Sequence, residues 1–126
     1  MEAGRGKEAA TQFRRAAELA PGRSGLLQAS IGQALVTSGD PSQMKQAITE
    51  IRRGLDLEPN NYNAYRFLAM AYGHTGDVGA AELATAEGYW QAGNFRESKV
   101  FAARAQQKFR PGTSQWQQAQ DIIQTR

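Results

Sequence analysis

Side chains that perform acid–base, nucleophilic or metal chemistry are sparse in this chain of 126 residues. It has no cysteine and one histidine, His74, which excludes thiolate metal sites and zinc motifs that need two histidines. A serine nucleophile would depend on His74 alone as its base. The glycines stand singly at the ends of expected helices instead of forming a phosphate-binding loop, and the carboxylates are scattered. We therefore expect no catalytic, cofactor-binding or metal site, and a protein that is not an enzyme.

Side chains suited to contact with a partner are better represented, on a helix expected over residues 62–75. Four of them recur at intervals of three and four, on the side away from the apolar residues. Arg66 can hold a carboxylate bidentately, and Met70 adapts to varied apolar partners. The residues expected to line a partner-binding groove are Asn63, Arg66, Met70 and His74, extended by Trp90 and Gln91 on the next helix. Two alternatives stay open: a solvated helix face for the first four, and a core position for Trp90.

The boundaries of this helix are clear in the sequence. Pro59 ends the preceding helix, because proline lacks the N–H that a continuing helix needs. Asn60 or Asn61 can then cap the new helix through a side-chain oxygen. Gly76 provides the stop at its far end.

The apolar face of the same helix carries Tyr65, Leu68, Ala69 and Tyr72. An aromatic residue, a large residue beside a small one, and then a tyrosine at this spacing resemble the first helix of a tetratricopeptide (TPR) repeat. Residues 7–21 and 44–57, each ending near a proline, resemble the second helix of such a repeat. The recurrence implies helix pairs that bury their faces on their neighbours, with a concave groove that takes a protein or peptide ligand.

The fold class we predict is all-α: a right-handed α-solenoid of antiparallel TPR-type helix hairpins, with about seven helices in one TPR-like domain over residues 1–126. Helices are expected over residues 7–21, 24–38, 44–57, 62–75, 78–92 and 95–109, followed by a last helix capped by Thr113 or Ser114. The helix over residues 78–92 has features of both members of a pair, so we expect two pairs to share it. Gly54 costs its helix about 1 kcal/mol relative to alanine, which a close approach of two helices would explain.

Two departures from a regular repeat are expected. The chain begins in mid-repeat with a second helix, so we infer a fragment of a longer protein whose Phe13 edge promotes self-association. The alternative is a natural single capping helix. Residues 39–47 are three residues longer than the usual hairpin, so either the loop bulges or the helix starts early, with Pro41 suited to its first turn.

Charge and hydropathy exclude other classes of partner. Fifteen basic and twelve acidic residues are interspersed, so we expect no nucleic-acid surface. No apolar run approaches the roughly 20 residues of a membrane span, and the first ten residues contain no signal-peptide apolar region. Residues 96–126 hold six basic and two acidic side chains, which either attract an acidic partner or serve solubility.

A closer resemblance covers residues 48–123, above all the run AELATAEGYWQAGNFRESKVFAARAQQKFRPGTSQWQQAQDII. This run resembles the C-terminal repeat region of bacterial BepA-like zinc metalloproteases. The resemblance implies a periplasmic parent whose catalytic half, with an HExxH helix, is absent from these residues, and a module that engages client or outer-membrane assembly proteins. The alternative is a stand-alone TPR adaptor or scaffold of the cytoplasm.

Overall fold

The computed structural model describes residues 3–19 and 24–125, and regular structure in this part of the chain is helical throughout. The helices are α1 (Ala3–Leu19), α2 (Gly25–Ser38), the short 3-10 helix η1 (Pro41–Gln43), α3 (Met44–Leu57), α4 (Tyr62–His74), α5 (Val78–Gln91), α6 (Phe95–Gln106) and α7 (Ser114–Gln124). The predicted all-α class is confirmed. No described helix is long and apolar enough to cross a membrane.

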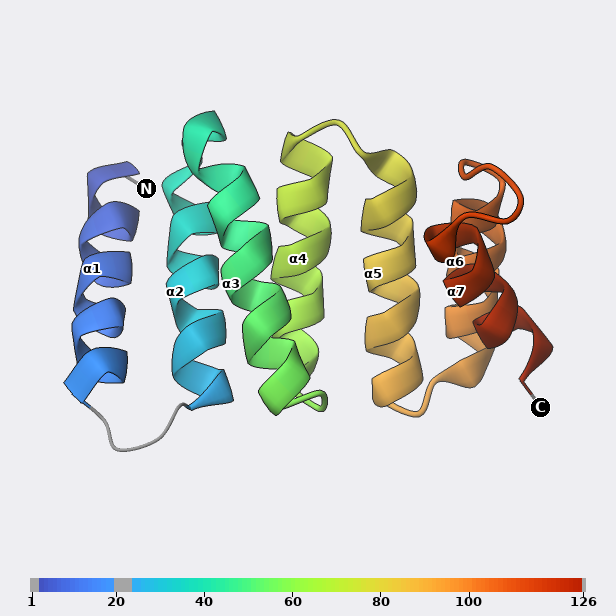
Figure 1. The fold of residues 1–126 in the computed structure, drawn as a ribbon, viewed down its shortest axis with the longest axis horizontal. Helices are drawn as coiled ribbons and strands as arrows, with labels where there is room; N and C mark the ends of the chain where they lie inside the picture. The colour runs from blue at the N-terminus through green and yellow to red at the C-terminus, as the bar shows by residue number, and fades with distance from the viewer. Residues whose placement is uncertain (1–2, 20–23, 126) are drawn as a thin grey trace.

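The helices follow one another along the molecule, with α1 at one end and α6 and α7 at the other (Figure 1). Each helix packs on the next. In two groups of three consecutive helices every member contacts the other two, since α4 contacts both α2 and α3, and α7 contacts both α5 and α6. We call α2–α3–α4 the first triad and α5–α6–α7 the second triad. The packing of α4 on α5 joins the two triads.

Side-chain caps begin most of these helices. Ser24 accepts a hydrogen bond from the Leu27 N–H at the start of α2, and Asp77 accepts one from Ala80 at the start of α5. At the start of α7 the cap is Thr113, one of the two predicted alternatives. The prediction that an asparagine side chain caps α4 is wrong, because Asn61 occupies the N-cap position but its side chain makes no capping hydrogen bond.

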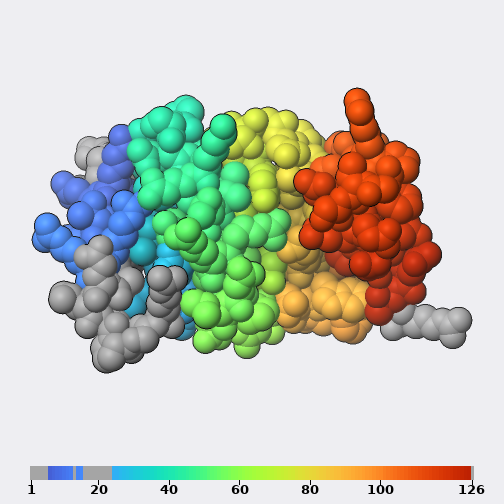
Figure 2. Space-filling view, in the orientation of Figure 1, coloured from blue at the N-terminus to red at the C-terminus, as the bar shows by residue number. Residues whose placement is uncertain are grey.

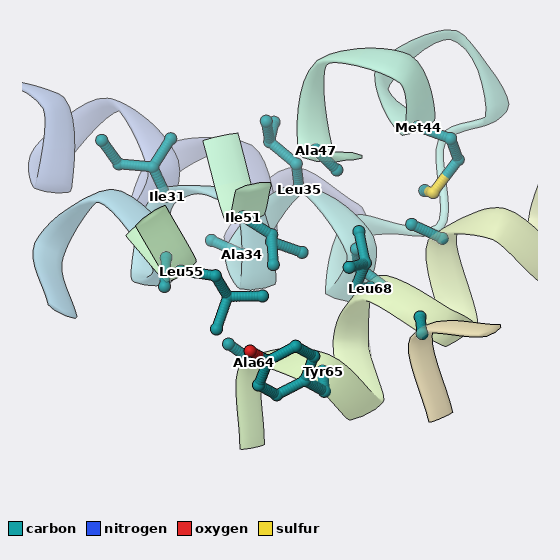
Figure 3. Close-up of a cluster of buried hydrophobic side chains, with 14 of the residues drawn as sticks. Ile31, Ala34, Leu35, Met44, Ala47, Ile51, Leu55, Ala64, Tyr65 and Leu68 are labelled. Carbon is teal, nitrogen blue, oxygen red and sulfur yellow. The ribbon is translucent and has the colours of Figure 1, made fainter. Parts of the chain in front are cut away.

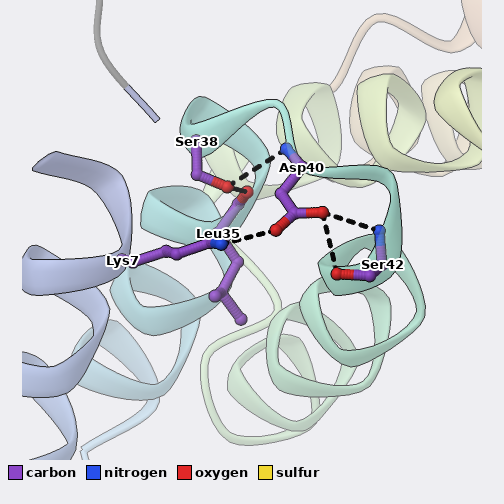
Figure 4. Close-up of polar contacts among 5 residues, drawn as sticks. All are labelled: Lys7, Leu35, Ser38, Asp40 and Ser42. Atoms are coloured by element: carbon purple, nitrogen blue, oxygen red, sulfur yellow. Dashed lines mark hydrogen bonds and ion pairs between the residues drawn. The ribbon is translucent and has the colours of Figure 1, made fainter. Parts of the chain in front are cut away.

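The long connection before α3 is a capped turn. Gly39 ends α2 with a φ of 71°, and η1 then fills the space before α3, so the helical path starts early. Asp40 accepts bonds from the N–H and hydroxyl of Ser42 at 3.0 and 2.8 Å. Lys7 of α1 reaches the other carboxylate oxygen at 2.6 Å, which ties the first helix to this turn (Figure 4).

The first core joins α2, α3 and α4. Large apolar side chains from the three helices point toward one another (Figure 3). Tyr65 and Leu68 of the predicted stripe are buried there, whereas Tyr72 is half-buried at its edge. The stripe was therefore predicted correctly as a packing face.

A second core belongs to the second triad. It consists of Leu83, Ala86, Ala102, Ala105 and Ala119. Helix α5 serves both cores, since Ala84, next to Leu83, is buried in the first one. Helix α5 therefore packs on both triads, whereas the expected division into TPR-type pairs stays a prediction.

Close backbone approach holds α2 against α3. A Cβ atom built on Gly54 would lie 2.7 Å from the backbone nitrogen of Ala29, and one on Gly32 would lie 2.8 Å from the carbonyl oxygen of Ala47. Neither neighbour can move without shifting a helix. The predicted close approach at Gly54 is confirmed, and only glycine fits there.

Two predictions fall outside the described part of the chain. The apolar edge assigned to Phe13 concerns a side chain that is not described, and Pro21 lies in the undescribed segment between α1 and α2.

Gly54 and Gly73 offer a matched pair of substitutions. Gly54→Ala is expected to lower the free energy of unfolding by about 1–3 kcal/mol, because overpacking against backbone outweighs the gain in helix propensity. Gly73 lies in α4, and a Cβ added there would have no atom within 4 Å, so Gly73→Ala should raise the free energy of unfolding by up to about 1 kcal/mol. Urea unfolding of both variants measures this. A shift of the same sign in both would contradict the account.

Asp40 makes stability depend on pH. Hydrogen bonds from Lys7, and then from Ser42, hold the pKa of Asp40 at about 2, below its ordinary 3.8. Because the folded-state pKa is the lower one, the contribution to stability is complete above pH 4 and is lost as the pH falls through about 2. As the pH is lowered from 4 to about 2, the urea concentration at the midpoint of unfolding should therefore fall less steeply for Asp40→Asn, and for Lys7→Met, than for the parent chain. Parallel curves would contradict this.

Candidate partner-binding groove

A groove crosses α5 where the two triads meet. In the space-filling view α5 lies recessed between the green helices α3 and α4 and the red helix α7 (Figure 2). The groove encloses about 310 Å³. Its lining, which defines the α5 groove, is Arg52 of α3, Tyr65 of α4, Glu87, Trp90 and Gln91 of α5, and Gln118, Asp121 and Ile122 of α7.

Arg52 fixes one wall of the α5 groove. Its Nη1 donates to Glu87 Oε2 at 3.0 Å, and its Nε and Nη2 donate to the Tyr72 hydroxyl at 3.4 and 3.3 Å. The guanidinium carbon also lies 5.7 Å from the centre of the Tyr72 ring. One side chain thus ties α3 to α4 and, through Glu87, to α5 in the second triad.

Neighbouring charges and burial keep Arg52 protonated and Tyr65 neutral in this wall of the groove. Burial lowers the pKa of Arg52, but the Glu87 carboxylate and the Tyr72 hydroxyl outweigh it, so the net shift is upward and the cation persists. Burial raises the pKa of Tyr65, and the charge of Glu87 raises it further. Tyr65 therefore stays protonated and donates to the Pro59 carbonyl at 3.0 Å.

Trp90 and Gln91, two of the six predicted residues, lie in the α5 groove. Trp90 is half-buried and belongs to neither core, and its ring packs on Phe95 with centroids 4.5 Å apart. Phe95 is itself 49% exposed. Trp90 gives the groove an apolar end, and the alternative of a core position for Trp90 does not hold.

The other four predicted residues do not join them. Arg66 lines a second depression between α4 and α5. Asn63, Met70 and His74 are exposed on α4 and line neither depression. For Arg66 the reason is helix geometry: at about 100° per residue, the α5 residues that line the groove and those that line the depression beside Arg66 point to opposite sides of α5. The six residues are therefore not one surface.

Several groove residues were missed from the sequence. Arg52 and its partner Glu87 are 35 positions apart, and no local sequence signal links them. The α7 residues Gln118 and Asp121 enter the groove because α7 folds back onto α5. Among the described residues, no group of three His, Asp or Glu side chains is placed to hold a metal ion.

Comparison of the chain with models of known protein families, with curated proteins and with solved structures finds no match in any of the three.

A double-mutant cycle tests the tie between the triads. Arg52→Ala and Glu87→Ala should each destabilise the protein, and the coupling energy between them should be about 0.5–1 kcal/mol, as for a partly exposed ion pair. Added salt should reduce the coupling by screening. Urea unfolding of the two single variants and the double variant gives this value. Strict additivity at low salt would show that the contact does not join the triads energetically.

Proposed function

We propose that this chain is a non-catalytic protein-binding module, built as a right-handed solenoid of TPR-type helix hairpins, that holds a polypeptide segment in the α5 groove. The TPR-type assignment is supported by the residue pattern at Tyr65, Leu68 and Tyr72. It is supported further by contacts that run mainly between helices adjacent or next to adjacent in the chain, as in a repeat stack.

The observation that carries the proposal is a pair of side-chain amides in the α5 groove that form no hydrogen bond with another described residue. Gln91 of α5 and Gln118 of α7 both line it, and neither makes a side-chain hydrogen bond to another described residue. Each amide offers two donors and an acceptor, the complement of a peptide backbone. Trp90 beside them supplies the large, rigid apolar surface typical of binding hot spots.

The charges of the groove add selectivity. Glu87 is satisfied by Arg52, whereas among the described residues the Asp121 carboxylate of α7 accepts only a local bond, from Gln117 at 2.9 Å. The uncompensated carboxylate favours a segment with a basic residue near its apolar anchor. Glutamine amides, a tryptophan and a carboxylate along one channel suit an extended, mildly basic peptide.

We further propose, from the resemblance over residues 48–123, that the parent protein is a BepA-like periplasmic zinc metallopeptidase. The module would then present client or outer-membrane assembly proteins to a protease domain encoded upstream. A stand-alone cytoplasmic adaptor is the alternative. The upstream coding sequence decides between them: a signal peptide and an HExxH motif support the first, an intact first repeat the second.

Selection of peptides from a displayed random library on the purified chain tests the binding function. The selected peptides should lose about tenfold or more in affinity on Trp90→Ala and measurably on the double change Gln91→Ala with Gln118→Ala. Gln46→Ala, an exposed change on α3 outside the groove, is the matched control and should bind as the parent does.

Thermal melting followed by circular dichroism checks that each variant folds. Failure to select any peptide, or selected peptides whose affinity is the same for all variants, would contradict the proposed function.

A further inference from the structure

A second depression lies between α4 and α5 on the side of α5 opposite the α5 groove. It encloses about 290 Å³. The residues that give it its character, which we call the tyrosine slot, are Tyr62, Arg66 and Ala69 of α4 with Gly88, Tyr89 and Ala92 of α5. The slot shares Tyr65 with the α5 groove, but their linings are otherwise different.

The depth of the slot comes from small residues between aromatic ones. Gly88 lets α5 approach so closely that an added Cβ would lie 2.8 Å from the Cβ of Tyr65. Ala69 and Ala92 leave room beside it, and Tyr62 and Tyr89 add aromatic surface to the lining. Tyr62 is 52% exposed although it is a large aromatic residue at the start of α4. An apolar side chain entering the slot would cover surface that now meets water.

The slot carries one kind of charge. Arg66 is the charged residue of its lining, and no acidic side chain lines it. Within the described residues Arg66 forms no ion pair, and its guanidinium lies 5.6 Å from the centre of the neighbouring Phe67 ring. Its donors are therefore open to a carboxylate, which a guanidinium can bind through two parallel hydrogen bonds.

We propose that the tyrosine slot is a second polypeptide-binding site, which takes a large apolar side chain of an acidic segment while a carboxylate beside that side chain pairs with Arg66. The volume is at the lower end of the range for ligand sites, so it suits one anchoring side chain and not a whole helix. Its positive rim is complementary to acidic partners, whereas the uncompensated Asp121 of the α5 groove selects basic ones. The two sides of α5 would thus hold segments of opposite charge.

Two synthetic peptides test this site. One carries tryptophan flanked by glutamates in a flexible glycine–serine frame, and the other carries glutamines in place of the glutamates. Backbone amide shifts of the labelled chain, followed during titration, report both affinity and position. The glutamate peptide should move the amide resonances of slot residues such as Arg66, Ala69 and Gly88, and leave those of Gln118 and Asp121 in the α5 groove unchanged. It should bind at least about fivefold more tightly than the glutamine peptide at low salt.

Three variants separate the contributions. Arg66→Gln should remove the preference for glutamate without changing the fold, because Arg66 is exposed. Ala92→Phe, at an exposed position, should fill the slot and weaken both peptides. Gln46→Ala, an exposed change on α3 outside both depressions, is the control and should leave the titration unchanged.

Three outcomes would overturn the inference: no binding of either peptide, equal binding of both, or shifts that map to the α5 groove. None of these outcomes bears on the proposed function, which is tested by the binding of library-selected peptides and by the effect of Trp90→Ala on that binding. Conversely, the proposed function alone would be rejected if no library peptide were selected while the glutamate peptide still bound more tightly than the glutamine peptide and lost this preference on Arg66→Gln.

Discussion

The structure depends on how closely its helix backbones approach one another. At Gly32 and Gly54 the backbones of α2 and α3 come so near that a single added carbon would meet main-chain atoms. The same principle joins α5 to α6, where Ser98 is fully buried and its hydroxyl donates to the carbonyl of Ala86 at 2.6 Å. Small residues at crossings leave little freedom in how two helices pack. Each triad is therefore expected to behave as a rigid unit.

Rigid triads account for the position of the candidate sites. The triads meet through α4 and α5, where Tyr65 packs against Gly88 and lines the depressions on both sides. Depressions consequently form on both sides of α5, one crossed by the Arg52–Glu87 ion pair and the other lined by tyrosines. The binding surfaces we propose arise from the joint between two packed units, and local sequence decides only which chemical groups line them.

The sequence predicted what depends on near neighbours along the chain. Helix positions, the cap at Thr113, the buried stripe of Tyr65 and Leu68, and the close approach at Gly54 follow from periodicity and from residue type and size. The orientation of α5 relative to α4 does not, because contacts between the helices set it, and it places Arg66 and Trp90 on opposite sides of α5. Long-range pairs such as Arg52 with Glu87 leave no local signal, and of the eight residues that line the groove only Trp90 and Gln91 were predicted.

Site-specific photo-crosslinking tests the central claim most directly, namely that the joint between the triads holds a polypeptide. A benzophenone amino acid at position 91 projects into the α5 groove, whereas the same amino acid at position 46 lies on the exposed surface of α3. With a library-selected peptide present, the account predicts a crosslinked adduct from position 91 and none from position 46. Equal capture at both positions, or capture at position 46 alone, would contradict it.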